Sequence, residues 1–386
     1  MAKSLIRTKR NLLLNMDNYL LLDNQRKSSV LEPFSSLNYT DGIFYFEWKN
    51  PFSIEKINTT FPGLWRYAKW LPVDYSQNCT LGEGYTPLIK LTFFGKEIFV
   101  KQEQLFPTGS YKDRGASVMI RAAIEQGVSH VIQDSSGNAG CAVAAYAARA
   151  GISCEIFVPE STSQDKLTQI VAYGAHLNKI SGDRTATAKA ALQAAKAHYY
   201  ASHCYNPFFY EGTKTFAYET VEQLGWRAPD AVVLPAGNGT LIIGAYLGFK
   251  HLLSSGIIDK MPRIIGVQAR NCAPLFQQWK GGERSNKFED TLAEGIAIPF
   301  PVRAKQMIEI IEETKGAFIT VTETQIKDTL GACIQNGFYI EPTSAATIAG
   351  LEEAFETFDE KNWVTLFSGH GLKSGAKLNA LFNQKH

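Results

Sequence analysis

The feature that most constrains the fold is an alternation of short β-rich runs with longer Ala-, Leu- and Ile-rich runs, which begins after about residue 90. Strand–loop–helix alternation is typical of α/β proteins, in which helices cover parallel sheets. The expected strands are Ile98–Val100, His130–Ile132, Cys154–Val158, His176–Ile180, Ala231–Leu234, Ile264–Val267, Phe318–Val321 and Trp363–Phe367. The expected helices are an Ala-rich run from Gly140 through Arg149, then Thr162–Tyr173, Thr185–His198, Leu241–Leu253, Glu323–Gln335 and Thr343–Phe355.

Length and charge exclude several classes of protein. A chain of 386 residues with 45% hydrophobic residues can form two ordinary domains with sizeable cores. The net charge of +2 gives no sign of the basic surface that binds nucleic acid. The longest apolar stretches, such as Leu241–Phe249, are too short to cross a membrane. We therefore expect neither a nucleic-acid partner nor a membrane.

The six cysteines are scattered along the chain and form no CxxC pair. This pattern predicts small buried side chains in a reducing compartment rather than a disulfide framework, and no metal site. The first residues are basic and then apolar, but Asn15 and Asp17 interrupt them, so they support a signal peptide only weakly. The expected location is cytoplasmic. Residues 1–40 are irregular and predict an N-terminal arm, and the aromatic-rich stretch from Gly42 onward is expected to pack onto the main body.

Four loops carry residues that suit ligand binding, and three of them follow an expected strand. Ligands of such sheets bind outside the carboxyl ends of the strands. The loops are 107–115 with Lys112, 135–140, 235–240, and 368–373 with His370. Each also has an ordinary structural explanation: a surface lysine, a capped strand–helix loop, a tight glycine turn and a structural histidine.

Together the four loops suit one cofactor, pyridoxal phosphate. A lysine can form a Schiff base with its aldehyde, and a glycine-rich loop before a helix can bind its phosphate. A further strand–helix loop can receive a substrate carboxylate, and a hydroxyl after the last strand can face the ring nitrogen.

The chain resembles threonine synthase, within the fold type II (tryptophan synthase β-like) group of pyridoxal-phosphate enzymes. The resemblance runs from about Trp65 to the end of the chain. The motifs that carry it, in chain order, are residues 81–88 (LGEGYTPL), 110–115 (SYKDRG), 136–139 (SGNA), 206–215 (NPFFYEGTKT), 237–240 (GNGT), 341–346 (EPTSAA) and 368–373 (SGHGLK).

The resemblance implies a role for each motif. Lys112 is expected to attach the cofactor and then act as general base. Asn138 is expected to bond the cofactor's ring oxygen, and Ser368 its pyridine nitrogen, where a neutral hydroxyl would leave the nitrogen largely unprotonated. The cofactor phosphate is expected to bind Gly237, Asn238, Gly239 and Thr240. The substrate is expected to contact Ser136, Gly137, Asn138, Ala139 and Phe209.

The resemblance also implies the domain organisation. Residues 41–115 and 215–386 are expected to form a large cofactor-binding domain, and 116–214 a small mobile domain. Each would be an open parallel-sheet domain, with the cofactor between them. The expected partner molecules are a small amino-acid substrate and a second copy of the chain, in a homodimer.

The sequence departs from the family pattern at several positions. Tyr111 replaces the usual Phe, Thr240 a second Gly, and Ser368 the usual Thr. Phe209 stands where threonine synthases carry an Arg that binds the substrate phosphate, and Phe cannot make that contact. Arg184, Lys214 and His203 are the cations that we consider as replacements. The N-terminal region also lacks the cysteines of the zinc ribbon found in some relatives.

Four functions remain open from the sequence. The first is the conversion of O-phosphohomoserine and water to threonine and phosphate. The second is a related reaction on a changed substrate: β-replacement on O-phosphoserine, as in cysteate synthase, or a specialised-metabolite replacement or elimination. The third is a threonine or serine dehydratase, and the fourth is a binding protein without activity. Retention of Lys112 argues against the fourth function. The Trp65–Trp70 region and residues 370–373 (HGLK) resemble threonine synthase more than a dehydratase, so we favour a lyase of the threonine synthase type.

Overall fold

The computed structural model describes residues 19–22, 44–162, 164–282 and 287–382. Their contacts divide the chain into two compact units. The first unit consists of the described residues up to Gly84 together with Lys112–Thr215. The second consists of Tyr85–Tyr111 and the described residues from Phe216 onward. The sequence predicts a large domain and a small mobile domain. Contacts within a single structure do not test whether a domain moves, so this division stays a prediction.

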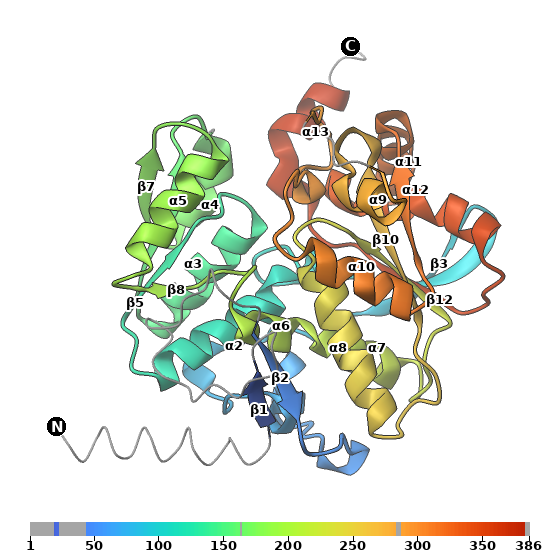
Figure 1. Ribbon diagram of the computed structural model, residues 1–386, viewed down its shortest axis with the longest axis horizontal. Helices are drawn as coiled ribbons and strands as arrows, with labels where there is room; N and C mark the ends of the chain where they lie inside the picture. Colours follow the sequence, from blue (N-terminus) through green and yellow to red (C-terminus); the bar gives the residue numbers. More distant parts are fainter. Residues whose placement is uncertain (1–18, 23–43, 163, 283–286, 383–386) are drawn as a thin grey trace. The chain divides into compact units, whose positions relative to one another are not determined.

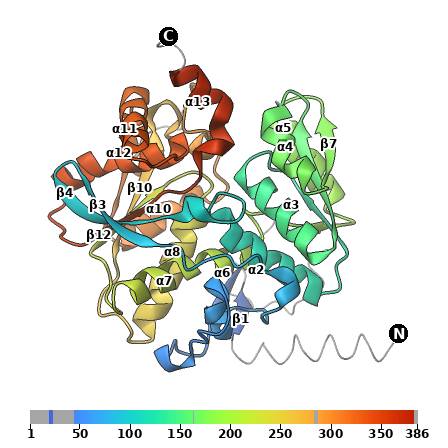
Figure 2. The ribbon, with the colours of Figure 1, turned by 180° about the vertical axis from the view of Figure 1, so that it is seen from behind.

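The second unit is built on a six-stranded sheet with the strand order β11-β10-β9-β12-β4-β3. In chain order the strands are β3 (Leu88–Phe93), β4 (Lys96–Lys101), β9 (Ala231–Pro235), β10 (Arg263–Ala269), β11 (Ala317–Val321) and β12 (Trp363–Leu366). All neighbouring pairs are parallel except β3 and β4, which form an antiparallel hairpin at one edge, drawn in cyan in Figure 2. Phe94 and Gly95, which connect them, both have positive φ, as tight hairpin turns require.

Helices cover this sheet because its strands are apolar on both faces. The helices from Thr215 onward are α7 (Thr215–Gln223), α8 (Thr240–Ser254), α9 (Pro274–Trp279), α10 (Ala304–Glu313), α11 (Glu323–Gln335), α12 (Pro342–Thr357) and α13 (Gly375–Phe382). Val233 and Val267 share one buried cluster with α11 and α12. Because side chains alternate along a strand, Val232 and Leu234 point to the other face, and α8 contacts β9 and β10. The helices from α8 onward are yellow to red in Figure 1.

The first unit contains a four-stranded parallel sheet with the order β7-β6-β5-β8. Its strands are β5 (His130–Gln133), β6 (Ser153–Pro159), β7 (His176–Ile180) and β8 (Tyr199–Tyr200). Its helices are α2 (Lys112–Glu125), α3 (Asn138–Ala150), α4 (Gln164–Ala172), α5 (Arg184–Ala194) and α6 (Pro207–Thr213). Helix α3 ends at Gly151, whose φ of 71° gives the left-handed conformation that closes many helices.

The aromatic-rich stretch packs onto the first unit, as predicted. It includes β2 (Tyr45–Trp48), which pairs with β1 (Tyr19–Leu22), and the short helix Gly63–Trp70. The indole of the fully buried Trp65 donates a hydrogen bond to Glu83 Oε1 at 2.6 Å. Of the predicted arm over 1–40, only β1 lies within the described residues.

The eight predicted strands are all present, each within two residues of its expected ends. Helix α11 matches its prediction at both ends, whereas α5 ends at Ala194, four residues before the expected His198. All six cysteines are buried and free, as expected of small buried side chains outside a disulfide framework. Within the described part of the chain, no helix has the length and apolar character needed to span a membrane.

Candidate active site

The glycine loop of the second unit joins β9 to α8 and is shaped by close backbone contacts. Gly239 has a φ of 86°, and a Cβ there would lie 2.7 Å from the sulfur of Met307. A Cβ on Gly237 would lie 3.0 Å from the carbonyl oxygen of Gly295. No side chain caps the first turn of α8, so its amides can serve an anion. The loop therefore fits the phosphate of the expected cofactor.

Tyr111 joins three of the predicted motifs within the second unit. Its backbone N–H donates to the carbonyl of Ser368 at 3.1 Å. Its hydroxyl lies 2.8 Å from Oγ1 of Thr240, the first residue of α8. Lys112 follows Tyr111 directly in the chain. The two replacements noted in the sequence, Tyr for Phe and Thr for Gly, thus form one buried hydrogen-bonded pair.

Replacing Tyr111 by Phe is expected to weaken pyridoxal phosphate binding about five- to tenfold, because a buried hydrogen bond of about 1 kcal/mol is lost. Thr240→Gly alone is expected to have a similar effect. The double variant Tyr111→Phe/Thr240→Gly should lose less than the sum of the two single effects, because both single variants remove the same hydrogen bond. Equilibrium binding of pyridoxal phosphate, followed by fluorescence, measures this. Strictly additive losses would contradict a coupled pair.

Ser368 is buried directly after β12 and belongs to a polar network. Its hydroxyl donates to Glu341 Oε1 at 2.8 Å and lies 3.1 Å from the hydroxyl of Ser344. Ser110, which forms an isolated β-bridge with Gly369, has a buried hydroxyl without a hydrogen-bond partner in the described structure. Buried polar atoms are normally satisfied, so this orphaned hydroxyl beside Ser368 is consistent with a polar ligand at this strand end.

In the first unit, Lys112 is the first residue of α2 and is half-buried. Its Nζ lies 5.9 Å from the centroid of the Phe209 ring. Phe209, in α6, is fully buried and packs on the backbone of Gly115, where a Cβ would lie 2.3 Å from the ring. The structure therefore brings together two predicted site residues, and the Phe209 ring occupies the space that a side chain at 115 would need.

The imidazole of His203 lies beside the Phe209 ring and is neutral. The two rings are 6.1 Å apart, in an edge-to-face arrangement, and Gln133 Nε2 lies 3.5 Å from His203 Nδ1. Burial lowers the pKa of His203 well below its usual value, and the positive charges of Lys112 and Arg184 lower that pKa further. A neutral imidazole cannot replace the missing arginine as a cation.

Lys214 is also unsuited to bind a substrate phosphate. It forms a buried ion pair with Glu211, and its Nζ lies 4.0 Å from the Trp48 ring centroid. Burial lowers the pKa of Lys214 to about 8. Of the three cations considered, Arg184 is the one that is exposed, at the first position of α5. Its charge acts on Asp134, whose carboxyl pKa is raised chiefly by burial.

The predicted carboxylate loop follows β5 and opens α3. Ser136 is half-buried, Gly137 is exposed, and Asn138 is the first helical residue. A Cβ on Gly140 would lie 1.8 Å from the carbonyl oxygen of Ser135, so the loop closes tightly on the first turn. No side chain caps this helix, which leaves amide groups at its start for an anion. The binding of a substrate carboxylate here stays a prediction.

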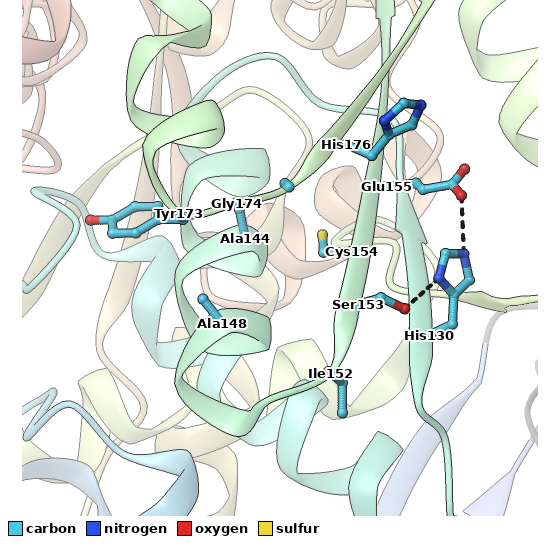
Figure 3. A pocket seen from close by; sticks show the side chains of 11 residues that line it. His130, Ala144, Ala148, Ile152, Ser153, Cys154, Glu155, Tyr173, Gly174 and His176 are labelled. Carbon is cyan, nitrogen blue, oxygen red and sulfur yellow. Dashed lines mark hydrogen bonds and ion pairs between the residues drawn. The ribbon is translucent and has the colours of Figure 1, made fainter.

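A separate cavity of about 260 Å³ lies in the first unit. Figure 3 shows the side chains that line it. It is lined by the starts of strands β5, β6 and β7, opposite the carboxyl ends that carry the predicted site. His130 Nδ1 lies 2.7 Å from Ser153 Oγ, and its Nε2 lies 3.6 Å from Glu155 Oε1. This is no nucleophilic triad, because the carboxylate is beyond hydrogen-bond distance and Ser153 already donates to the carbonyl of Ser129.

Sequence reasoning missed the roles of two residues that the structure places at the site. Glu341 was part of a recognised motif without a role, and Tyr111 was only a departure from the family pattern. Both act through hydrogen bonds to residues more than 25 positions away. No local signal marks such contacts.

Comparisons with known proteins agree with this geometry. Residues 79–369 match the family described as pyridoxal-phosphate dependent enzyme. The chain is 36% identical to the threonine synthase of Methanocaldococcus jannaschii over 345 residues, 85% of each chain. It is 34% identical to that of Methanosarcina acetivorans, over 83% of this chain and 82% of the relative. The structure resembles a pyridoxal 5'-phosphate-dependent aspartate racemase with a TM-score of 0.64 and 27% identity, over 74% of this chain and 90% of the racemase. The chain therefore belongs to the fold type II pyridoxal-phosphate enzymes, and within them to the threonine synthase family.

Proposed function

We propose that this enzyme converts O-phosphohomoserine and water to threonine and phosphate. The observation that carries the proposal is the match to threonine synthases over more than four-fifths of the chain, with a lysine at the head of α2. The glycine loop before α8 and the polar network at Ser368 support pyridoxal phosphate as the cofactor. When bound, that cofactor supplies an electron sink for carbanion chemistry.

The chain's own residues then have distinct tasks. Lys112 would hold the cofactor through its amine and, once released, move protons as the general base. The amides of Gly237, Asn238 and Gly239, with Thr240, would hold the cofactor phosphate. Asn138 would orient the ring through its oxygen, and the loop 136–139 would orient the substrate carboxylate.

The phosphate of the substrate needs a cation, and we propose Arg184 for this task. Lys214 is held in a buried ion pair, and His203 is neutral. Arg184 is exposed at the start of α5, and guanidinium groups suit bidentate contacts with phosphate.

The test measures phosphate release and the amino-acid product with O-phosphohomoserine, beside O-phosphoserine with sulfite. The expected product of the first reaction is threonine. Arg184→Met is expected to raise KM for O-phosphohomoserine about tenfold or more, because one charge-assisted phosphate contact is worth about 1.5–3 kcal/mol. Lys189→Met, an exposed lysine in the same helix, is the matched control and should leave KM unchanged.

One observation favours the second function, a related reaction on a changed substrate. The buried ring of Phe209 stands where the resemblance leads us to expect a phosphate-binding arginine, and the neutral His203 lies beside it. β-Replacement on O-phosphoserine, or another replacement or elimination, would follow if O-phosphohomoserine gives no threonine. Homodimer formation and a cytoplasmic location stay predictions from the resemblance.

A further inference from the structure

Glu341 lies behind Ser368 in a buried position that the proposed reaction does not yet use. Its carboxylate accepts the hydroxyl proton of Ser368 at 2.8 Å. The exposed fraction is 6% for Glu341 and 1% for Ser368. The backbone of Gly369 packs so closely that a Cβ there would lie 2.4 Å from the Glu341 carboxyl carbon. The contact is therefore tightly constrained.

Glu341 also lies at the start of a helix. It is the N-cap residue of α12, a helix of 16 residues that begins with Pro342. The positive end of a helix dipole stabilises a negative charge at this position. An ionised carboxylate accepts hydrogen bonds and donates none. The proton of the Ser368 hydroxyl is consequently directed toward Glu341.

A serine hydroxyl has one proton to donate. Because this proton is directed to Glu341, Ser368 can only accept a hydrogen bond from any further group. The hydroxyl of Ser344, 3.1 Å away, can donate to the same oxygen and fix this orientation. Ser344 Oγ accepts the backbone N–H of Gly369 at 3.3 Å, and its own proton can go either to Ser368 Oγ or to the carbonyl of Gly369, which lies 3.5 Å away.

We propose that Glu341 is a positioning residue that turns Ser368 into a pure hydrogen-bond acceptor and so favours the protonated form of the cofactor's ring nitrogen. This inference rests on the assignment of Ser368 to that nitrogen in the proposed function. It reverses the expectation from Ser368 alone, according to which a neutral hydroxyl leaves the nitrogen largely unprotonated. A protonated ring withdraws electrons more strongly, so the network would strengthen the cofactor as an electron sink.

The experiment is 15N NMR of the enzyme loaded with pyridoxal phosphate labelled at the pyridine nitrogen. In the wild type the nitrogen signal is expected in the pyridinium range. Glu341→Ala should move it to the range of unprotonated pyridine, because the freed Ser368 hydroxyl can then donate to the nitrogen. Glu341→Met has a similar size but no acceptor oxygen for the Ser368 proton, and it should move the signal in the same direction if the alanine variant folds poorly. Glu352→Ala, an exposed glutamate of the same helix, is the control and should leave the signal in place.

Three outcomes would overturn the inference. The first is an unprotonated nitrogen in the wild type. The second is a pyridinium signal that stays in place in both Glu341 variants while Ser368→Ala moves it, which overturns the role of Glu341 and leaves the assignment of Ser368 intact. The third is a signal that Ser368→Ala does not move, which overturns the assignment of Ser368 and with it the inference.

Discussion

Lys112→Ala is expected to lower kcat by about 10²- to 10⁴-fold, the range for loss of a general acid–base group. It should also abolish covalent attachment of the cofactor, because no other amine replaces the one at the head of α2. In the wild type, borohydride reduction should fix pyridoxal phosphate on the peptide that contains Lys112, which mass spectrometry identifies. In the variant that peptide should carry no cofactor.

Two controls distinguish this chemistry from a general loss of structure. Lys189→Ala removes an exposed lysine of α5 and should retain both activity and the labelled peptide. Lys112→Arg keeps a long cationic side chain but removes the amine that can form a Schiff base, and it should be as inactive as Lys112→Ala. A labelled peptide from any other lysine of the wild type would refute the assignment.

The predicted strands of both sheets are present because their local pattern and their environment agree. Strands such as β9 are buried along their full length and consist of apolar residues, which any reading of the sequence detects. Strand β3 was missed because it lies at a sheet edge and none of its six residues is fully buried. Its turn uses Phe94 with a φ of 48° before Gly95, a pair that is not among the usual hairpin signals.

The glycine loop of the candidate site was predictable from the sequence, because its backbone conformation requires glycine. Gly239 must be glycine because its φ is positive and Met307 fills the space of a side chain. The partners of Ser368 and Tyr111 could not be predicted, because they depend on contacts between segments brought together by the sheet. The cationic side chain that would bind the substrate phosphate could not be chosen from the sequence for the same reason. The sequence offers three candidates, and only their burial separates Lys214 and His203 from Arg184.

The largest effect on stability is expected from the buried pair of Lys214 and Glu211 in the first unit. Both side chains are almost fully buried, and the indole of Trp48 donates to Glu211 Oε2 at 2.9 Å. Lys214→Met should reduce the free energy of unfolding by about 3–5 kcal/mol, because it leaves the Glu211 carboxyl buried without its counter-charge. Denaturant unfolding, with midpoint and slope fitted together, measures this change.

The double variant Glu211→Gln/Lys214→Met is expected to recover much of that loss, since no buried charge remains. The pair also has a pH signature. Burial lowers the pKa of Lys214 from 10.5 to about 8, so between these values the unfolded chain binds more protons than the folded chain. The contribution of Lys214 to stability therefore rises with pH across this window, and the rise should be absent in both variants.

The exposed pair of Lys305 and Glu309 provides the control, because Lys305→Met should change the free energy of unfolding by less than about 0.5 kcal/mol. An equally small change for Lys214→Met would mean that Glu211 is protonated in the folded enzyme, in agreement with the upward shift that burial gives its pKa.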